Sequence, residues 1–81
     1  MVTASEVVET ITALLVEVGE VDPATITPRS QLADLGLDSV EVMEVVSQVE
    51  DRYDVTLSED QLGRVSTVRE LARCVERLLK E

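Results

Sequence analysis

Three short polar patterns with one common spacing divide this chain into helical segments. In each pattern an oxygen-bearing side chain precedes a glutamate by three positions. The pairs are Thr3 and Glu6, Asp38 and Glu41, and Thr67 and Glu70. Such a pair is typical of a capping box, in which both side chains bond free backbone N–H groups at a helix start. Because an apolar stripe at helical spacing follows every pair, the sequence predicts three helices.

The apolar stripes give approximate limits for these helices. The first is expected over residues 3–19, the second from residue 38 or 39 to residue 53, and the last from residue 66 or 67 onward. Ser58 is expected to cap a fourth, shorter helix that ends at Gly63. The many valines of the second helix lower its intrinsic helix propensity, so burial in the tertiary structure must supply the balance.

The segment between Gly19 and Leu37 lacks helical periodicity and contains both prolines, Pro23 and Pro28. Each proline disfavours helix in the residue before it. Aliphatic residues nevertheless recur along the segment, which predicts a long, structured first loop held against a core. The predicted fold is all-α: a small four-helix bundle with three long helices and one short helix, forming a single domain over residues 1–81.

Composition limits the chemistry that this bundle can perform. Tyr53 is the only aromatic residue, so the core must be aliphatic, and the chain has one cysteine, Cys74, and no histidine. Neither a zinc site nor a histidine-based catalytic triad can be built from these residues. We therefore expect no bound metal and no catalytic residue. Cys74 lies beside the apolar stripe of the last helix, and we expect it to be a small, buried or half-buried hydrophobic residue.

The charge is strongly negative and unevenly distributed. The formal net charge is −10, and the stretch from Asp38 to Asp60 alone carries −7, because Arg52 is its only basic residue. Such a chain repels nucleic acid and anionic membranes, and it favours partners with basic docking surfaces. No apolar run approaches membrane-spanning length, and the N-terminus lacks the features of a signal peptide. We expect a monomeric cytoplasmic protein.

Ser39 can be interpreted in three ways. Serine is common at helix N-termini, and judged by spacing alone an ordinary cap is the commoner role. Asp38 already fills that role, however, which leaves the Ser39 hydroxyl in the first turn, exposed and available for covalent modification. A catalytic nucleophile would need an activating base, which the chain lacks, and G-L-D-S-V is not the G-x-S-x-G motif of serine hydrolases.

The stretch "LGLDSVEVMEVVSQVEDRYDVTLSED" resembles the signature region of acyl carrier proteins. The likeness extends to the opening helix, the proline-containing loop and the final helix "VSTVRELARCVERLLKE". It therefore covers essentially the whole chain. It implies a protein that is not an enzyme but carries acyl intermediates as thioesters on a 4′-phosphopantetheine arm. Carried over to this sequence, Ser39 is the attachment site and Asp38 is the acid beside it.

The resemblance also implies partners and further sites. A phosphopantetheinyl transferase would attach the arm, and ketosynthase, acyltransferase and other synthase enzymes would read an acidic helix face. The expected recognition residues are Val40, Glu41, Met43, Glu44, Glu50 and Asp51. The residues that could line a cavity for the acyl chain are Ile26, Leu35, Val42, Val46, Leu62 and Leu71. The alternative for each acidic residue is that it simply lies on a solvated helix face. The alternative for each cavity residue is ordinary packing in the core.

Two departures from the family pattern bear on the pathway. Val40 follows the serine where the family often has leucine, and the chain has no phenylalanine, unlike most fatty-acid carriers. The segment "EDRYDVTL" is similar to discrete carriers of polyketide pathways. Polyketide biosynthesis is therefore the first prediction, with a fatty-acid synthesis carrier or a stand-alone peptidyl or aminoacyl carrier as alternatives. A different class, an unmodified acidic helical adaptor protein, would need the charge but not the Ser39 hydroxyl.

Overall fold

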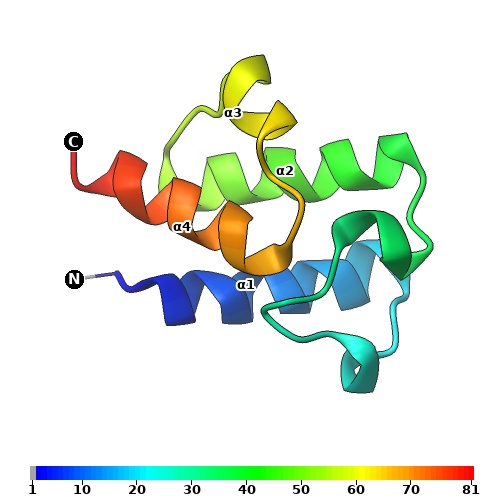
Figure 1. The fold of residues 1–81 in the computed structure, drawn as a ribbon. Coiled ribbons are helices and arrows are strands. Elements are labelled where there is room, and N and C mark those ends of the chain that lie inside the picture. Colours follow the sequence, from blue (N-terminus) through cyan, green and yellow to red (C-terminus); the bar gives the residue numbers. More distant parts are fainter. Residues whose placement is uncertain (1) are drawn as a thin grey trace.

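The computed structural model describes residues 2–81, which form four α-helices and two 3-10 turns (Figure 1). The α-helices are α1 (Ala4–Gly19), α2 (Ser39–Tyr53), α3 (Glu59–Gly63) and α4 (Val68–Leu79). The 3-10 turns, η1 (Pro23–Thr25) and η2 (Leu32–Leu35), lie in the loop between α1 and α2. The predicted all-α bundle with one short helix and a structured first loop is therefore confirmed.

The predicted caps account for most of the helix starts. Asp38 with Glu41 and Thr67 with Glu70 each form a complete capping box. At α1 the prediction is half wrong. Thr3 accepts a hydrogen bond from the backbone N–H of Glu6, but no reciprocal bond from the Glu6 side chain completes the box in the described residues.

A tertiary contact contributes at the start of α1 instead. The backbone N–H of Ala4 donates to a carboxylate oxygen of Glu76 in α4, with 3.0 Å between the two atoms. Glu76 and Ala4 are 72 positions apart in the sequence, so local spacing could not reveal this bond. The bond joins the N-terminus of α1 to the C-terminal half of α4, which lie near one another in Figure 1.

The core is aliphatic and centres on α1, which packs against both α4 and α2. The largest fully buried side chains come from these three helices and are Val7, Ile11, Leu15, Val45, Val49, Val68, Leu71 and Val75. Cys74 is buried, as predicted. Tyr53 is half-buried, and its hydroxyl oxygen lies 2.7 Å from Oγ1 of Thr10, which joins the end of α2 to α1.

Helix α1 ends at Gly19, but the left-handed residue that terminates it is Glu20, with φ at 54°. Gly19 has a different role, because a Cβ at this position would overlap the Leu37 side chain. The absent side chain allows Leu37, two positions before α2, to pack against the end of α1. This glycine therefore helps to fix where α2 begins.

Replacing Glu20 with glycine is expected to stabilise the protein. The left-handed conformation is unfavourable for a residue with a Cβ by about 1 kcal/mol, whereas glycine adopts it readily. We expect the free energy of unfolding to rise by up to about 1 kcal/mol and the thermal midpoint by a few degrees. Asp54→Gly is the matched control, since Asp54 has the same φ of 54° and aspartate tolerates this conformation better. A lower midpoint for Glu20→Gly would contradict this account.

Backbone hydrogen bonds hold the first loop against the start of α4. The N–H of Leu32 donates to the Ser66 carbonyl (2.9 Å), and the N–H of Val68 donates to the Ser30 carbonyl (3.1 Å). An isolated antiparallel bridge between Gln31 and Thr67 lies between these two bonds. The loop is therefore pinned just before the turn that leads into α2.

Candidate functional site

Ser39 is the first residue of α2, and its side chain is exposed. Its neighbours satisfy the helix start without it. Asp38 Oδ1 accepts from the Glu41 backbone N–H at 2.8 Å, and Glu41 Oε1 accepts from the Asp38 backbone N–H at 3.1 Å. Within residues 2–81 the Ser39 hydroxyl takes part in no hydrogen bond of its own. The hydroxyl is therefore open to solvent and not committed to capping.

The approach to Ser39 is set by the turn before it. Gly36 follows η2 in the left-handed conformation, with φ at 77°, which reverses the chain without steric cost. Leu37 then packs onto the core beside Gly19, and the chain emerges at the surface at Asp38. The half-buried Leu37 and the glycine turn together place Ser39 outward at the helix end.

The electrostatic setting of Ser39 is compatible with an attached phosphate. The backbone N–H groups in the first turn of a helix have no intrahelical partner and attract anions. Asp38 Oδ1 already accepts from one of them, that of Glu41, and the N–H groups of Ser39 and Val40 remain. The carboxylates of Asp38 and Glu41 offset part of this positive field. A phosphodiester on the Ser39 oxygen would therefore be tolerated there.

Four of the six expected recognition residues form an open surface along α2. Val40 is 73% exposed and Met43 is 54% exposed, which is unusual for such large apolar side chains. Glu44 and Asp51 are also exposed. We call these four residues the α2 face. It combines two negative charges with two apolar contacts on the helix that begins at Ser39.

The other two expected recognition residues, Glu41 and Glu50, are half-buried and bonded within the chain. Glu41 belongs to the capping box. Glu50 Oε2 accepts from the backbone N–H of Leu57 at 2.7 Å. This bond holds the segment after α2 against the helix, so Glu50 has a structural role that the charge pattern did not reveal.

Replacing Glu50 with alanine is expected to destabilise the protein by about 1–3 kcal/mol. The substitution leaves the N–H of the buried Leu57 without its acceptor. Glu44→Ala removes the same charge from an exposed position of the same helix and should change the stability by less than about 0.5 kcal/mol. Denaturant titration of the two variants measures the difference, and equal effects would show that the Leu57 bond contributes nothing.

A largely apolar groove of about 310 Å³ opens between α2, α3 and α4. Four residues expected to line an acyl cavity lie together around it: Val42, Val46, Leu62 and Leu71. The other residues that line the groove are Leu32, Met43, Gly63 and Val65. Beneath it lies a much smaller apolar void of about 10 Å³, which shares Leu32, Val42, Val46 and Leu71 with the groove.

Ile26 and Leu35 are not among the residues that line this groove. Both pack as partly buried residues against the core from the first loop, and Leu35 faces a separate surface pocket formed by that loop. The sequence reasoning missed Leu32, whose apolar character in the loop was a usable signal. It also missed Gly63, which borders open space and widens the groove simply by lacking a side chain.

Two other kinds of feature, a metal-binding cluster and a membrane-spanning helix, are absent from the described residues. No cluster of histidine, cysteine or carboxylate side chains that could hold a metal occurs within residues 2–81. None of the helices in this part of the chain is long and apolar enough to cross a membrane. The outstanding chemical feature is the exposed hydroxyl at the start of an acidic helix.

Known proteins resemble this chain in sequence. Residues 9–75 match the family described as "Phosphopantetheine attachment site". The meromycolate extension acyl carrier protein of Mycobacterium tuberculosis (strain ATCC 25618 / H37Rv) is 32% identical over 81 residues, which cover 99% of this chain and 70% of that protein. The non-reducing polyketide synthase tazA of Aspergillus terreus is 33% identical over 75 residues, covering 93% of this chain but 3% of that protein.

A solved structure shares the fold. The NMR structure of the HMG-ACPI domain from the CurA module of Lyngbya majuscula superimposes with a TM-score of 0.79 at 24% identity. The match covers 96% of this chain and 80% of that one. The helical architecture of residues 2–81 is therefore the architecture of a known acyl carrier domain.

The chain belongs to the phosphopantetheine attachment site family and is an acyl carrier protein. Its cofactor is 4′-phosphopantetheine, whose terminal thiol holds acyl groups as thioesters. The chain is thus a carrier that enzymes act upon, not a catalyst.

Proposed function

We propose that Ser39 is the residue to which 4′-phosphopantetheine is attached. One observation carries this proposal: the exposed Ser39 hydroxyl is free of hydrogen bonds within residues 2–81, while Asp38 and Glu41 cap the helix. In a serine that served as the cap, the side-chain oxygen would accept a hydrogen bond from a backbone N–H group. The free N–H groups of the first turn favour the phosphate that attachment would bring.

The attachment reaction needs groups that the chain does not supply. The Ser39 oxygen would form a new bond to the phosphorus of the pantetheine phosphate in coenzyme A, and adenosine 3′,5′-bisphosphate would leave. The serine proton must go to a base, and the chain has no histidine to accept it. A phosphopantetheinyl transferase would therefore provide the base and the metal ion, and this chain would provide an accessible oxygen at a fixed position.

Loading of the wild-type chain separates a carrier from an unmodified acidic adaptor. The purified apo protein is incubated with coenzyme A and a broad-specificity phosphopantetheinyl transferase, and the intact mass is measured. We expect a gain of one phosphopantetheine arm per chain. A chain that gains no arm, although a known carrier protein in the same assay does, would favour the adaptor.

The α2 face would present this carrier to its enzymes. Val40, Met43, Glu44 and Asp51 are exposed on the helix that begins at Ser39, so a partner bound there would lie close to the arm. Charge attraction across such a surface raises the association rate without requiring a tight complex. Weak contacts suit a chain that must leave each transferase, ketosynthase or acyltransferase after one step.

Reversing the charge of the α2 face is expected to slow loading by about tenfold or more. The variant is Glu44→Lys with Asp51→Lys, and the measurement is kcat/KM of the transferase for the apo chain. The matched control replaces two exposed acids on α1, Glu9→Lys with Glu17→Lys, which makes the same change in net charge. The wild-type rate should fall as salt rises. Equal slowing in both double variants would mean that only total charge matters.

The groove between α2, α3 and α4 is the place we propose for a bound acyl chain. Its apolar lining and its volume of about 310 Å³ suit a short aliphatic group, and Met43 belongs to both the groove and the α2 face. The test is NMR of the protein carrying an eight-carbon acyl group against the unacylated form. Shifts at Val46, Leu62 and Leu71 would support sequestration, and shifts confined to Ser39 and its neighbours would oppose it.

For the pathway, we propose polyketide biosynthesis, supported by the "EDRYDVTL" segment and the likeness to part of a polyketide synthase. Fatty-acid elongation is the second candidate, because the meromycolate extension carrier matches nearly the whole chain. Offering the malonyl-loaded protein to ketosynthases of both types would separate these pathways. Condensation with the fatty-acid enzyme alone would overturn the polyketide assignment.

A further inference from the structure

The positive charges of this acidic protein are concentrated at one end of the chain. Residues 64–81 hold five of the seven basic residues and three acidic ones, a net charge of +2. Residues 1–63 carry a net charge of −12. The last helix and its approach therefore present a surface whose sign is opposite to that of the rest of the molecule.

Helix stability does not account for all of this basic charge. Cations are favourable near the C-terminus of a helix, which suits Arg77 and Lys80. Arg69 lies in the first turn of α4, where a cation is unfavourable, and Arg73 lies in the middle. Arg69, Arg73 and Arg77 are also spaced four residues apart, so that like charges repel along one face. Burial does not explain them either, because all are exposed.

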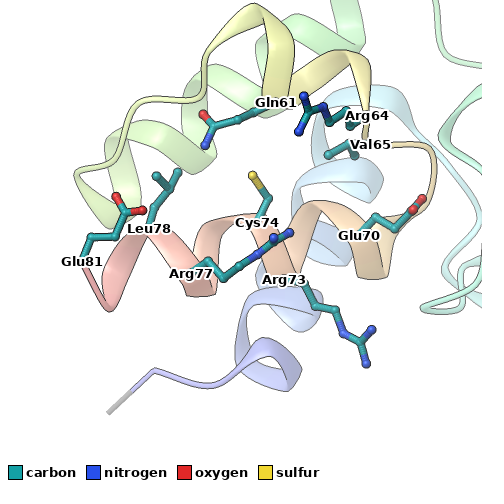
Figure 2. A pocket seen from close by; sticks show the side chains of 9 residues that line it. All are labelled: Gln61, Arg64, Val65, Glu70, Arg73, Cys74, Arg77, Leu78 and Glu81. Carbon is teal, nitrogen blue, oxygen red and sulfur yellow. The ribbon is translucent and has the colours of Figure 1, made fainter.

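A groove of about 400 Å³ lies between α3 and α4, and three arginines, Arg64, Arg73 and Arg77, contribute to its lining. Arg64 and Arg77 lie beside the groove, whereas the guanidinium group of Arg73 extends away from α3 (Figure 2). Val65, Cys74 and Leu78 supply the apolar part of the groove's lining. Figure 2 shows the Cys74 sulfur pointing from α4 toward α3 at the centre of this space. We call this site the basic groove.

Two acids, Glu70 and Glu81, offset part of the positive charge of the basic groove but not all of it, because three arginines line the same groove. One Glu70 oxygen accepts from the backbone N–H groups of Ser66 and Thr67, each at 3.0 Å. Both bonds lower the pKa of Glu70, and the bond from Ser66 has the larger effect. The Glu70 carboxylate therefore stays charged at the helix N-terminus. Glu81 lies at the opposite end of the groove in Figure 2.

We propose that the basic groove is a docking site for an acidic segment of a partner protein, with one aliphatic side chain between aspartate or glutamate residues. Val65 and Leu78 would contact the apolar side chain, and the guanidinium groups of Arg64 and Arg77 would pair with the flanking carboxylates in the bidentate geometry that arginine favours. The volume lies in the range of ligand pockets, about 300–1,000 Å³.

This docking site differs from the α2 face in sign and in place. The α2 face would attract basic surfaces, whereas the basic groove would attract an acidic one. An acidic partner segment could therefore hold the carrier without covering Ser39 or the α2 face. The proposal does not depend on attachment at Ser39, because it concerns only α3, α4 and the segment between them.

The test measures fluorescence anisotropy of a labelled peptide with a central leucine flanked by glutamates, titrated with the apo protein at low ionic strength. We expect saturable binding. Arg64→Ala and Arg77→Ala should each weaken it about tenfold, and Arg52→Ala, the same charge change on α2, should have less than a twofold effect. Replacing the peptide's glutamates with glutamine, or its leucine with serine, should also weaken binding.

NMR of the labelled protein locates the bound peptide and checks that the variants fold. Shifts at Val65, Cys74 and Leu78 are expected. The proposal is overturned if no binding occurs, if Arg52→Ala weakens binding as much as Arg77→Ala, or if the shifts fall on α2. It is also overturned if vesicles of anionic lipid bind this groove and displace the peptide, since the groove would then recognise a lipid surface.

Discussion

Replacing Ser39 with alanine should abolish phosphopantetheine loading and leave the fold intact. Alanine lacks the oxygen that would form the phosphodiester. The helix start survives because Asp38 and Glu41 make the capping bonds and the Ser39 hydroxyl makes none within residues 2–81. Intact mass after incubation with coenzyme A and the transferase should show no added arm. The free energy of unfolding should change by less than about 0.5 kcal/mol, as for an exposed position without a special role.

Matched serine variants make the Ser39 result interpretable. Ser47 is exposed on the same helix, two turns further along, and Ser47→Ala should load as fully as wild type. Asp38→Ala should instead lower stability by about 1 kcal/mol, because it removes the cap. If Ser39→Ala unfolded the protein and Asp38→Ala did not, Ser39 would be the cap, and the exposed-hydroxyl interpretation would be wrong.

Replacing Leu15 with alanine should destabilise the protein by about 2–5 kcal/mol. Leu15 is fully buried in α1 and borders the small apolar void beneath the groove. The substitution would enlarge that void at the point where α1, α2 and α4 meet. Because the core has no aromatic ring, aliphatic contacts of this kind supply its apolar burial. For a domain of this size the loss is a large fraction of the total stability.

Denaturant unfolding measures this effect, with Leu79→Ala as the control. Leu79 is 36% exposed in the last turn of α4, so the same substitution there should cost less than about 1 kcal/mol. The midpoint for Leu15→Ala should fall well below that for Leu79→Ala at an unchanged slope. Equal midpoints would show that the burial of Leu15 does not make the contribution to stability that we predict.

Sequence reasoning succeeded where local chemistry decides the structure. Helix starts follow from side chains three positions apart, so the boxes at Asp38 and Thr67 could be predicted without any fold. It failed where the deciding contact comes from a residue that is distant in the sequence. Glu76 bonds the start of α1, and Gly19 serves the packing of Leu37 rather than the helix stop itself.

In the candidate site, too, some features could be predicted from the local sequence and others depend on the tertiary structure. The position of Ser39 and the exposure of Val40 and Met43 follow from helical periodicity. Periodicity cannot show that Glu50 turns back to bond Leu57, which makes it a structural residue. Likewise the groove is formed by three helices and the first loop, so its members, such as Gly63, emerge only from the tertiary structure.

The most direct test of the central claim is to locate the arm on the loaded protein. The loaded chain is digested, and tandem mass spectrometry identifies the residue that carries the phosphopantetheine. We predict that every modified peptide contains Ser39 and that fragment ions place the added mass on that residue. An arm found on Ser47, Ser58 or any other hydroxyl, with Ser39 unmodified, would contradict the account.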